Sequence, residues 1–365
     1  MAAPAPAAPA DVPAVTGDAA AYAPDADTWD HVVRAAAHCG QLEAAALLMR
    51  ATRAHAHDPE LLARTRGVRG KHGRTLLMRA VMRCDVARAA EIVGAAPTPA
   101  ARAELLAYVD VDGFTALHLA CGPNRVYEDA ALALVGLLLG AGADPLVRYH
   151  YPDNGLDYQP IHYAAQWSVS IVQRLVQAGA SIDGDVVGNS TLCCAAGAAT
   201  ARGVRMIPAL VALGARETLG NRAMHYFACW PAEGAPASDE EVLAALTALV
   251  SVGCSVIEPD EDDDHTPMDD AACNGNAPVV RALLALGVVA TTKSLAHAVE
   301  HPEIVRLLLA AGAPPGGLVR LEAGAAPASP LMRAACASSL ESVRLLLAAG
   351  ASLVQRNAHG DTALM

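Results

Sequence analysis

The sequence predicts an all-α fold, a solenoid of stacked helix-turn-helix units joined by short β-hairpin or loop segments. Two observations support this prediction. Hydrophobic residues make up 53% of the 365-residue chain but aromatic residues only 4%, and alanine is the most frequent hydrophobic residue. Such a composition favours closely packed helices over β-sheets. A Leu-rich segment that ends in Gly-Ala, or a close variant, also recurs along the chain, and repeat periods of about 20–50 residues are typical of solenoids.

The Leu-rich segments are expected to form the second helix of each unit. One of them, residues 304–309, carries an apolar stripe suited to packing on a neighbouring helix. A glycine follows each segment because glycine tolerates the left-handed backbone conformation that ends a helix. The end markers are Gly142-Ala143, Gly179-Ala180, Gly214-Ala215, Gly253-Cys254, Gly287-Val288, Gly312-Ala313 and Gly350-Ala351.

A second motif precedes the Leu-rich segments and is expected to begin the first helix of each unit. A threonine such as Thr115 or Thr266 can cap a helix with its side chain, and Pro160, Pro267 or Pro330 suits the first turn. No unit can bury both of its faces alone, so the stack itself is the expected core. The copies are Thr115–Ala120, Gln159–Ala164 and Thr266–Ala271, with weaker copies at Thr75–Ala80, Ser190–Cys193, Ala223–His225 and Ser329–Ala335.

These two motifs, Thr-Pro-Leu-His-x-Ala and Leu-Leu-x-x-Gly-Ala, make residues 70–365 resemble the ankyrin-repeat family. The resemblance implies an array of about eight units, after which residues 361–365 open a further repeat. The irregular unit lengths are similar to those of divergent family members, including those of large DNA viruses. Residues 27–69 are expected to form a degenerate helical repeat or cap with a basic linker, and the Ala/Pro-rich residues 1–26 to be disordered.

The resemblance implies that a partner protein binds the concave face and the fingers, the segments that link one unit to the next. Two irregular fingers supply candidate contact residues. One contains tyrosines, which offer a large contact area with few rotatable bonds, although tyrosines that merely close a long loop explain it equally well. The other is an acidic run, either a solvated loop or a contact for a basic partner. The candidates are Tyr149, His150, Tyr151, Asp153 and Tyr158 in the first finger, and Asp260, Glu261, Asp262, Asp263 and Asp264 in the second.

Patterns that suggest a metal site are better explained by the repeat. His297, Glu300 and His301 match the His-x-x-Glu-His pattern of some zinc proteases. They fall in a first-helix position, however, Pro302 interrupts that helix, and no third ligand follows, so exposed histidines on a repeat helix are expected. The acidic run lacks the central glycine and closing glutamate of a calcium loop. We therefore expect no metal and no cofactor.

The remaining motifs give no catalytic residue. The segment Gly70-Lys71-His72 lacks the earlier glycine of a phosphate-binding loop. One cysteine near the end of several first helices is expected to be buried and to pack like alanine, and one histidine position has a structural hydrogen-bonding role that the resemblance implies. These residues are Cys121, Cys229, Cys273 and Cys336, and His118, His162 and His225.

Composition narrows the classes of function. The net charge of −12 argues against nucleic acid as the main partner. No apolar run is long enough for a bilayer, and irregular cysteine spacing indicates reduced thiols in the cytoplasm or nucleus. We predict a non-catalytic protein-interaction scaffold without a small-molecule substrate. Two alternatives stay open: a substrate-recognition adaptor of a ubiquitin ligase, indicated only by the scarcity of lysine (Lys71 and Lys293), and a fragment of a larger enzyme or channel.

Overall fold

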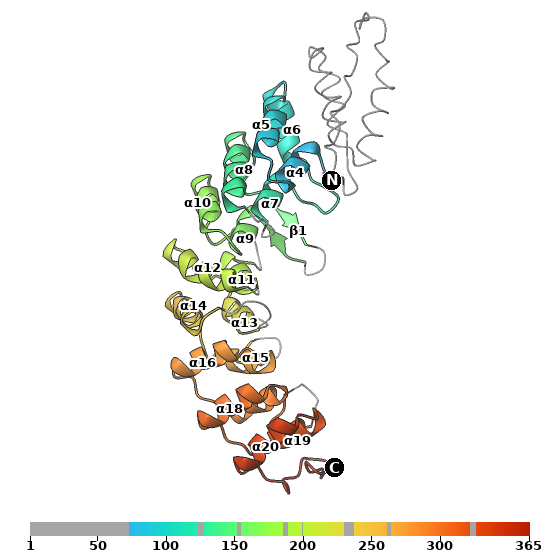
Figure 1. Cartoon of the computed structure of the whole chain (residues 1–365), viewed down its shortest axis with the longest axis vertical. Coiled ribbons are helices and arrows are strands. Elements are labelled where there is room, and N and C mark those ends of the chain that lie inside the picture. Colours follow the sequence, from blue (N-terminus) through green and yellow to red (C-terminus); the bar gives the residue numbers. More distant parts are fainter. Residues whose placement is uncertain are drawn as a thin grey trace, which may run out of the picture. The chain divides into compact units, whose positions relative to one another are not determined.

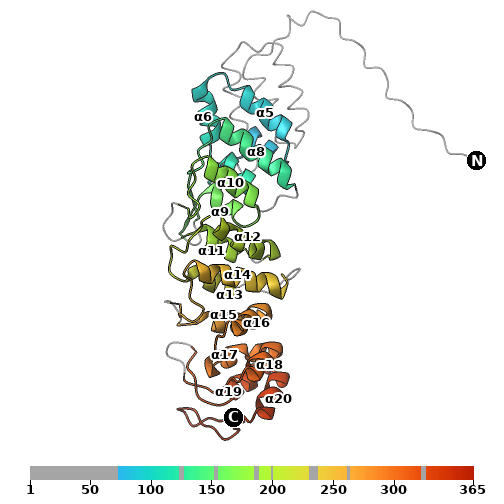
Figure 2. The same ribbon diagram turned by 90° about the vertical axis from the view of Figure 1, so that its left-hand side faces the viewer.

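The computed structural model describes residues 73–122, 127–151, 155–184, 189–198, 200–229, 237–260, 264–321 and 326–365. Almost all of these residues belong to one compact unit, Leu77–Met365. Within this unit short helices follow one another in pairs, and each pair stacks on the next (Figures 1 and 2). The predicted all-α solenoid is therefore confirmed. The predictions for residues 1–26 and 27–69 lie outside the described ranges.

The helices form two layers. The first helices are α4 (Leu76–Met82), α7 (Ala116–Cys121), α9 (Pro160–Ala164), α11 (Thr191–Ala196), α13 (Arg222–Ala228), α15 (Pro267–Cys273), α17 (Thr292–His297) and α19 (Pro330–Cys336). The second helices are α5 (Val86–Gly94), α8 (Glu128–Gly140), α10 (Val169–Gln177), α12 (Ala201–Ala212), α14 (Asp239–Ser251), α16 (Ala277–Ala285), α18 (Pro302–Ala310) and α20 (Leu340–Ala348). From α7 onward each first helix contacts the next first helix, and each second helix contacts the next second helix. One layer therefore carries the fingers and the other covers its back.

Each second helix from α8 onward ends in the same way. The glycine after its cap residue has a φ between 85° and 103°, in the left-handed region that favours glycine. The next amide then donates to the carbonyl five residues earlier, as Ala143 N–H does to Leu138 O at 2.9 Å. This bond satisfies a carbonyl at the helix end, and it explains the recurring Gly-Ala marker.

Hydroxyl side chains begin the first helices as predicted. Thr115 Oγ1 accepts a hydrogen bond from the amide of His118, and the His118 ring returns a bond to the Thr115 amide. This reciprocal arrangement satisfies two amides that have no partner inside the helix. A hydroxyl side chain also caps α11, α15 and α19, and the reciprocal bond is present at α15 and α19.

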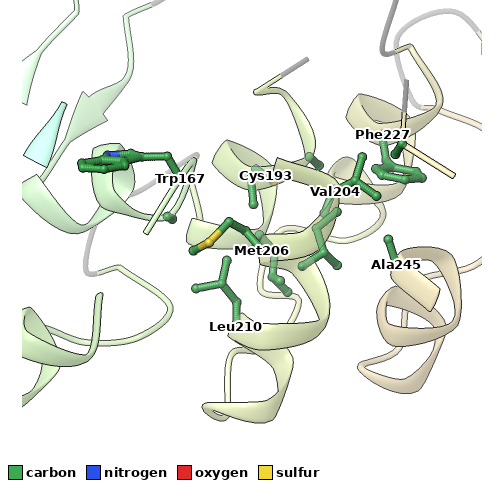
Figure 3. Packing of buried hydrophobic residues seen from close by; sticks show 14 of the residues in the cluster. Trp167, Cys193, Val204, Met206, Leu210, Phe227 and Ala245 are labelled. Atoms are coloured by element: carbon green, nitrogen blue, oxygen red, sulfur yellow. The ribbon is translucent and has the colours of Figure 1, made fainter. Parts of the chain in front are cut away.

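The core runs continuously between the two layers and from unit to unit. In Figure 3 apolar side chains from α11, α12, α13 and α14 gather in one layer. Trp167, after α9, donates from Nε1 to the Cys121 carbonyl at 2.8 Å, and the Arg202 guanidinium lies 5.8 Å from the centre of its ring. Core residues labelled there include Cys193, Val204, Met206, Leu210, Phe227 and Ala245.

The structure corrects the prediction for the cysteines. Cys121 is buried, because Trp167 of the next unit covers the end of α7. Cys229, Cys273 and Cys336 are exposed, since each lies at the point where its first helix ends and the chain turns towards solvent. They therefore do not act as buried substitutes for alanine.

Two further elements differ from the sequence-based expectation. Helix α6 (Pro99–Ala107), capped by Thr98, lies between two units and was not expected from the repeat motifs. Residues 361–365 form turns rather than the first turn of a helix. In the part of the chain that the structure describes, no helix is long and apolar enough to cross a membrane.

Candidate functional site

The finger before α9 is a β-hairpin made of β1 (Tyr149–His150) and β2 (Asp157–Tyr158). The strands are antiparallel, with Tyr149 opposite Tyr158 and His150 opposite Asp157. On the exposed face His150 Nδ1 lies 2.9 Å from Asp157 Oδ1. The hairpin therefore brings three predicted contact residues together and places Tyr151 directly after β1.

Tyr149 supports this hairpin from beneath. Its ring stacks on Phe114 with 4.3 Å between centroids, and its side chain is only 7% exposed. Gly113 lies directly under the ring, because a Cβ there would be 2.8 Å from Tyr149 Cδ2. The assignment of Tyr149 as a contact residue is therefore corrected, since its face is already covered by the preceding finger.

The outer side of the aromatic cluster consists of Tyr151, Tyr158 and Tyr163. The ring centroids of Tyr151 and Tyr158 are 6.1 Å apart, and those of Tyr158 and Tyr163 are 5.7 Å apart. Tyr151 is 37% exposed and the other two are half-buried. Burial raises the pKa of Tyr163, and nearby phenols raise it further. Its hydroxyl is therefore a neutral hydrogen-bonding group on an otherwise apolar face.

A further tyrosine on the finger side, Tyr226 of α13, is 41% exposed. Partial burial raises the pKa of Tyr226, and the charge of Arg222 opposes this shift. Helix α11 lies between α9, which carries Tyr163, and α13, which carries Tyr226, and it contacts both helices. We call Tyr151, Tyr158, Tyr163 and Tyr226 the tyrosine strip.

Histidines hold the fingers against the first helices. His118 Nε2 lies 3.3 Å from the Tyr158 carbonyl, and His225 Nε2 lies 3.1 Å from the Glu258 carbonyl. The equivalent His162 packs against Gly184, where a Cβ would be 2.3 Å from its Nε2. Each histidine thus contacts the finger of the following unit, and this fixes where the strip and the next finger lie.

The acidic finger is partly tied to the helix layer. The Asp260 amide donates to the His265 carbonyl at 2.7 Å, and the Asp264 amide donates to the Asp260 carbonyl at 3.1 Å. The Lys293 ammonium donates to the Asp264 carbonyl and lies 3.4 Å from its carboxylate. Asp260 and Asp264 therefore sit on a closed turn next to α17. Asp153, Glu261, Asp262 and Asp263 lie outside the described residues.

Beside this finger a buried carboxylate joins two histidines. Asp270 Oδ2 lies 2.7 Å from His225 Nδ1, and Asp270 Oδ1 lies 3.3 Å from His265 Nδ1. The His265 ring in turn packs edge-on against His297 at 4.4 Å. Burial lowers the pKa of His297 to about 4, and His265 adds to the effect. Asp270 and the three histidines thus connect α13, α15 and α17. Their hydrogen bonds and ring packing explain why these polar side chains are buried there.

The zinc-type pattern does not form a metal site. His297 ends α17 and packs on His265, whereas His301 lies beyond the 3-10 turn Ala298–Glu300 and donates from Nε2 to the Cys273 carbonyl at 3.0 Å. Both side chains are half-buried, so the expected exposed histidines on one helix are also corrected. Among all residues with described positions, no group of three or more His, Cys, Asp or Glu side chains is placed to hold a metal ion.

Sequence reasoning missed two residues of the strip. Tyr163 and Tyr226 each follow the motif histidine directly, at His162 and His225. That shared position was a usable signal, because the residue after the histidine keeps part of its surface accessible in both units.

The chain was compared with family models, with curated proteins and with solved structures. Residues 112–149 and 328–358 match the family model described as Ankyrin repeat. The crystal structure of the human ASB11 ankyrin repeat domain is similar, with 17% sequence identity, a TM-score of 0.32, and coverage of 80% of this chain and 90% of that chain. The search of curated proteins gave no match. Two segments of the chain therefore match the ankyrin-repeat model, and both lie within the stack of helix pairs described above.

Proposed function

We propose that the chain is a non-catalytic scaffold that binds a partner protein across its hairpin, fingers and first helices. The tyrosine strip carries this proposal. Ring contacts restrain Tyr151, Tyr158 and Tyr163, so these side chains lose little conformational freedom on binding. Tyrosine is also enriched among residues that dominate binding energy. The proposed site of action is the cytoplasm or nucleus. Burial raises the pKa of Cys193 and of Cys194, so both are expected to remain unreactive thiols there.

The test is a selection of binding peptides from a random display library against the wild-type protein. The selected peptides should bind the wild type and lose about tenfold in affinity to the double variant Tyr151→Ala/Tyr226→Ala, which removes two partly exposed rings. A variant at Tyr127, which is 67% exposed next to the outer helix α8, is the matched control. Peptides that bind the double variant as well as the wild type would contradict the proposed surface.

A further inference from the structure

Two histidines at the same motif position, His118 and His225, face different chemical groups. His118 Nδ1 lies 3.3 Å from the Thr115 amide nitrogen, and His118 Nε2 lies 3.3 Å from the Tyr158 carbonyl oxygen. One ring nitrogen therefore meets a donor and the other an acceptor, and a neutral imidazole satisfies both with its single N–H group. Burial also lowers the pKa of His118 to about 4, so this ring is neutral at physiological pH.

His225 instead faces an acceptor at each ring nitrogen. Its Nδ1 lies 2.7 Å from Asp270 Oδ2, and its Nε2 lies 3.1 Å from the Glu258 carbonyl oxygen. A carboxylate and a carbonyl can only accept hydrogen bonds, so both contacts are satisfied only when the ring carries two N–H groups, as imidazolium does. The His225 side chain is 5% exposed, so water has little access to either nitrogen.

Asn221 connects this ring to residues 255–258, the segment that follows α14. Asn221 Oδ1 accepts from the Ser255 amide, and Asn221 Nδ2 donates to the Ser255 carbonyl, both at 2.8 Å. These two bonds fix the orientation of the Asn221 amide, whose Nδ2 lies 3.4 Å from His225 Nε2. When the ring is neutral with its proton on Nδ1, the Nε2 lone pair can accept from Asn221, but it also faces the Glu258 oxygen. The two lone pairs repel, and the Glu258 carbonyl loses its charged donor.

Neighbouring carboxylates favour the charged ring. Burial opposes the charge on His225, but the hydrogen bond and charge of Asp270, together with the charge of Asp260, outweigh burial and raise the pKa of His225. Asp270 also serves His265, whose Nδ1 lies 3.3 Å from Asp270 Oδ1. Among the described residues, the other titratable groups on α13 and on the helices that contact it make no hydrogen bond with the His225 ring. These are Arg222, Tyr226, Cys193, Cys194, Asp239, Glu240, Glu241, Asp269 and Cys273.

We propose that His225 holds residues 255–258 against α13 while its ring is protonated and releases this segment as the pH rises. The segment leads directly to Asp260, so its release moves the start of the acidic finger. The hairpin finger keeps its position over the same pH range, because the His118 ring that contacts it is already neutral. The change is a property of the folded chain and needs no partner.

The first experiment follows the protonation of the ring by NMR in the full chain, with histidine labelled with ¹³C at Cε1. The His225 signal is assigned by its absence from His225→Gln, or by its shift in Asp270→Asn if the first variant does not fold. In the wild-type protein this signal should be that of an imidazolium at about pH 6.5, the usual histidine pKa, and should titrate above it. A ring that is neutral at about pH 6.5 would overturn the proposal.

The second experiment measures amide hydrogen exchange of the wild-type protein below and above the titration of His225. Labelling times are scaled to cancel the intrinsic dependence of exchange on pH. Protection of residues 255–258 should fall about three- to tenfold above the titration, as expected when a hydrogen bond to a charged group is lost. Strands β1 and β2 are the internal control and should keep their protection. Unchanged protection of residues 255–258, or an equal fall in the two strands, would contradict the release.

Matched variants separate the hydrogen bond from the general effect of negative charge. Asp270→Asn removes the carboxylate at Nδ1, so the titration of His225 should move down by about one to two pH units, and residues 255–258 should exchange faster already at about pH 6.5. Asp260→Asn removes a charge that makes no hydrogen bond with the ring, and should move the titration by less than half as much. Equal shifts would show that overall charge controls the ring, and would overturn the proposal. The wild-type measurements decide it even if Asp270→Asn does not fold.

Discussion

The turns before α5, α16 and α20, each between the two helices of a unit, contain a left-handed residue, and the residue type at this position differs among them. Gly275 has φ 74°, whereas Cys84 and Ser338 adopt φ 57° at the equivalent turns before α5 and α20. A left-handed conformation costs a residue with a Cβ roughly 1–2 kcal/mol, and the extra freedom of glycine in the unfolded chain offsets part of this.

We expect Ser338→Gly to raise the free energy of unfolding by up to about 1 kcal/mol. The reverse change, Gly275→Ser, should lower it by about 1–3 kcal/mol, because a Cβ there would also lie 2.7 Å from the His301 ring. Urea unfolding of both variants measures the two effects. A stabilised Gly275→Ser protein would show that the turn is not strained.

The buried imidazoles make stability depend on pH. Burial lowers the pKa of His118 and of His162 from the usual 6.5 to about 4. A histidine with a depressed folded-state pKa contributes stability that is complete above pH 6.5 and is lost as pH falls towards 4, because only the unfolded chain takes up the proton there.

The unfolding free energy should therefore fall between about pH 7 and pH 5, by roughly 1–3 kcal/mol for each such histidine. His162→Gln should unfold with a shallower dependence on pH, since glutamine does not titrate. Urea unfolding over a pH series checks this. Parallel profiles for the two proteins would mean that His162 gains a proton without unfolding.

For His225, which pairs with Asp270, the dependence of stability on pH has the opposite sign. Burial alone would lower the pKa of His225, but the hydrogen bond and charge of Asp270 outweigh it and raise the pKa. Burial likewise opposes, but does not prevent, a lowered pKa at Asp270. The contribution of His225 is complete below about pH 6.5 and is lost as pH rises through its folded pKa, and that of Asp270 is lost as pH falls through its own.

Asp270→Asn should therefore destabilise the protein more at about pH 5.5 than at a pH above the folded-state pKa of His225, where the imidazole is neutral. Thermal melting at the two pH values measures the difference. An equal loss of stability at both pH values would show that the hydrogen bond between Asp270 and His225 does not depend on a charged imidazole.

At the scale of the helix, Arg281 joins three second helices, because its guanidinium on α16 binds Asp239 on α14 and Glu303 on α18. All three side chains are at least one-third exposed, and such pairs contribute about 0.2–1 kcal/mol each. Arg344, 3.8 Å from Glu341 within α20, links no neighbouring units.

Arg281→Met should lower the free energy of unfolding by about 1 kcal/mol, and less in high salt because the pairs are screened. Arg344→Met, the matched control, should change it by less than about 0.5 kcal/mol. Chemical unfolding at low and high salt compares them. A loss for Arg281→Met that is independent of salt would point to packing of its aliphatic stem instead.

Elements with strong local signals were predictable from the sequence. The Gly-Ala ends and hydroxyl caps act through neighbours within five residues, so Thr115 and Gly142 could be assigned without a structure. The sequence located the hairpin, but it did not show which of its tyrosines would be buried. The burial of Tyr149 depends on Phe114 from the preceding finger. Likewise, nothing local to Asp270 shows that it meets His225 of another unit.

At the scale of the described unit, stability is the sum of contacts between neighbours. Helix α14 lies between α12 and α16 and buries Val242, Ala245, Leu246 and Leu249. Helix α20 buries only Ser342 and Leu346. Fewer buried apolar contacts mean a lower free energy of local opening.

Amide hydrogen exchange should therefore be faster in α20 than in α14, with the protection of α19 following that of α20 because the two pack together. Mass spectrometry of peptides after timed exchange resolves these helices. Uniform protection along the stack would mean that the whole unit opens in one step.

The fluorescence of Trp167 can report on local unfolding within this stack. Its ring is nearly inaccessible, its nitrogen is bonded to the end of α7, and a guanidinium from α12 covers it. In a Trp29→Phe/Trp230→Phe background, the emission maximum of Trp167 should shift to longer wavelength when the contact between α7 and the residues after α9 opens to water. This shift is expected even while distant helices stay folded.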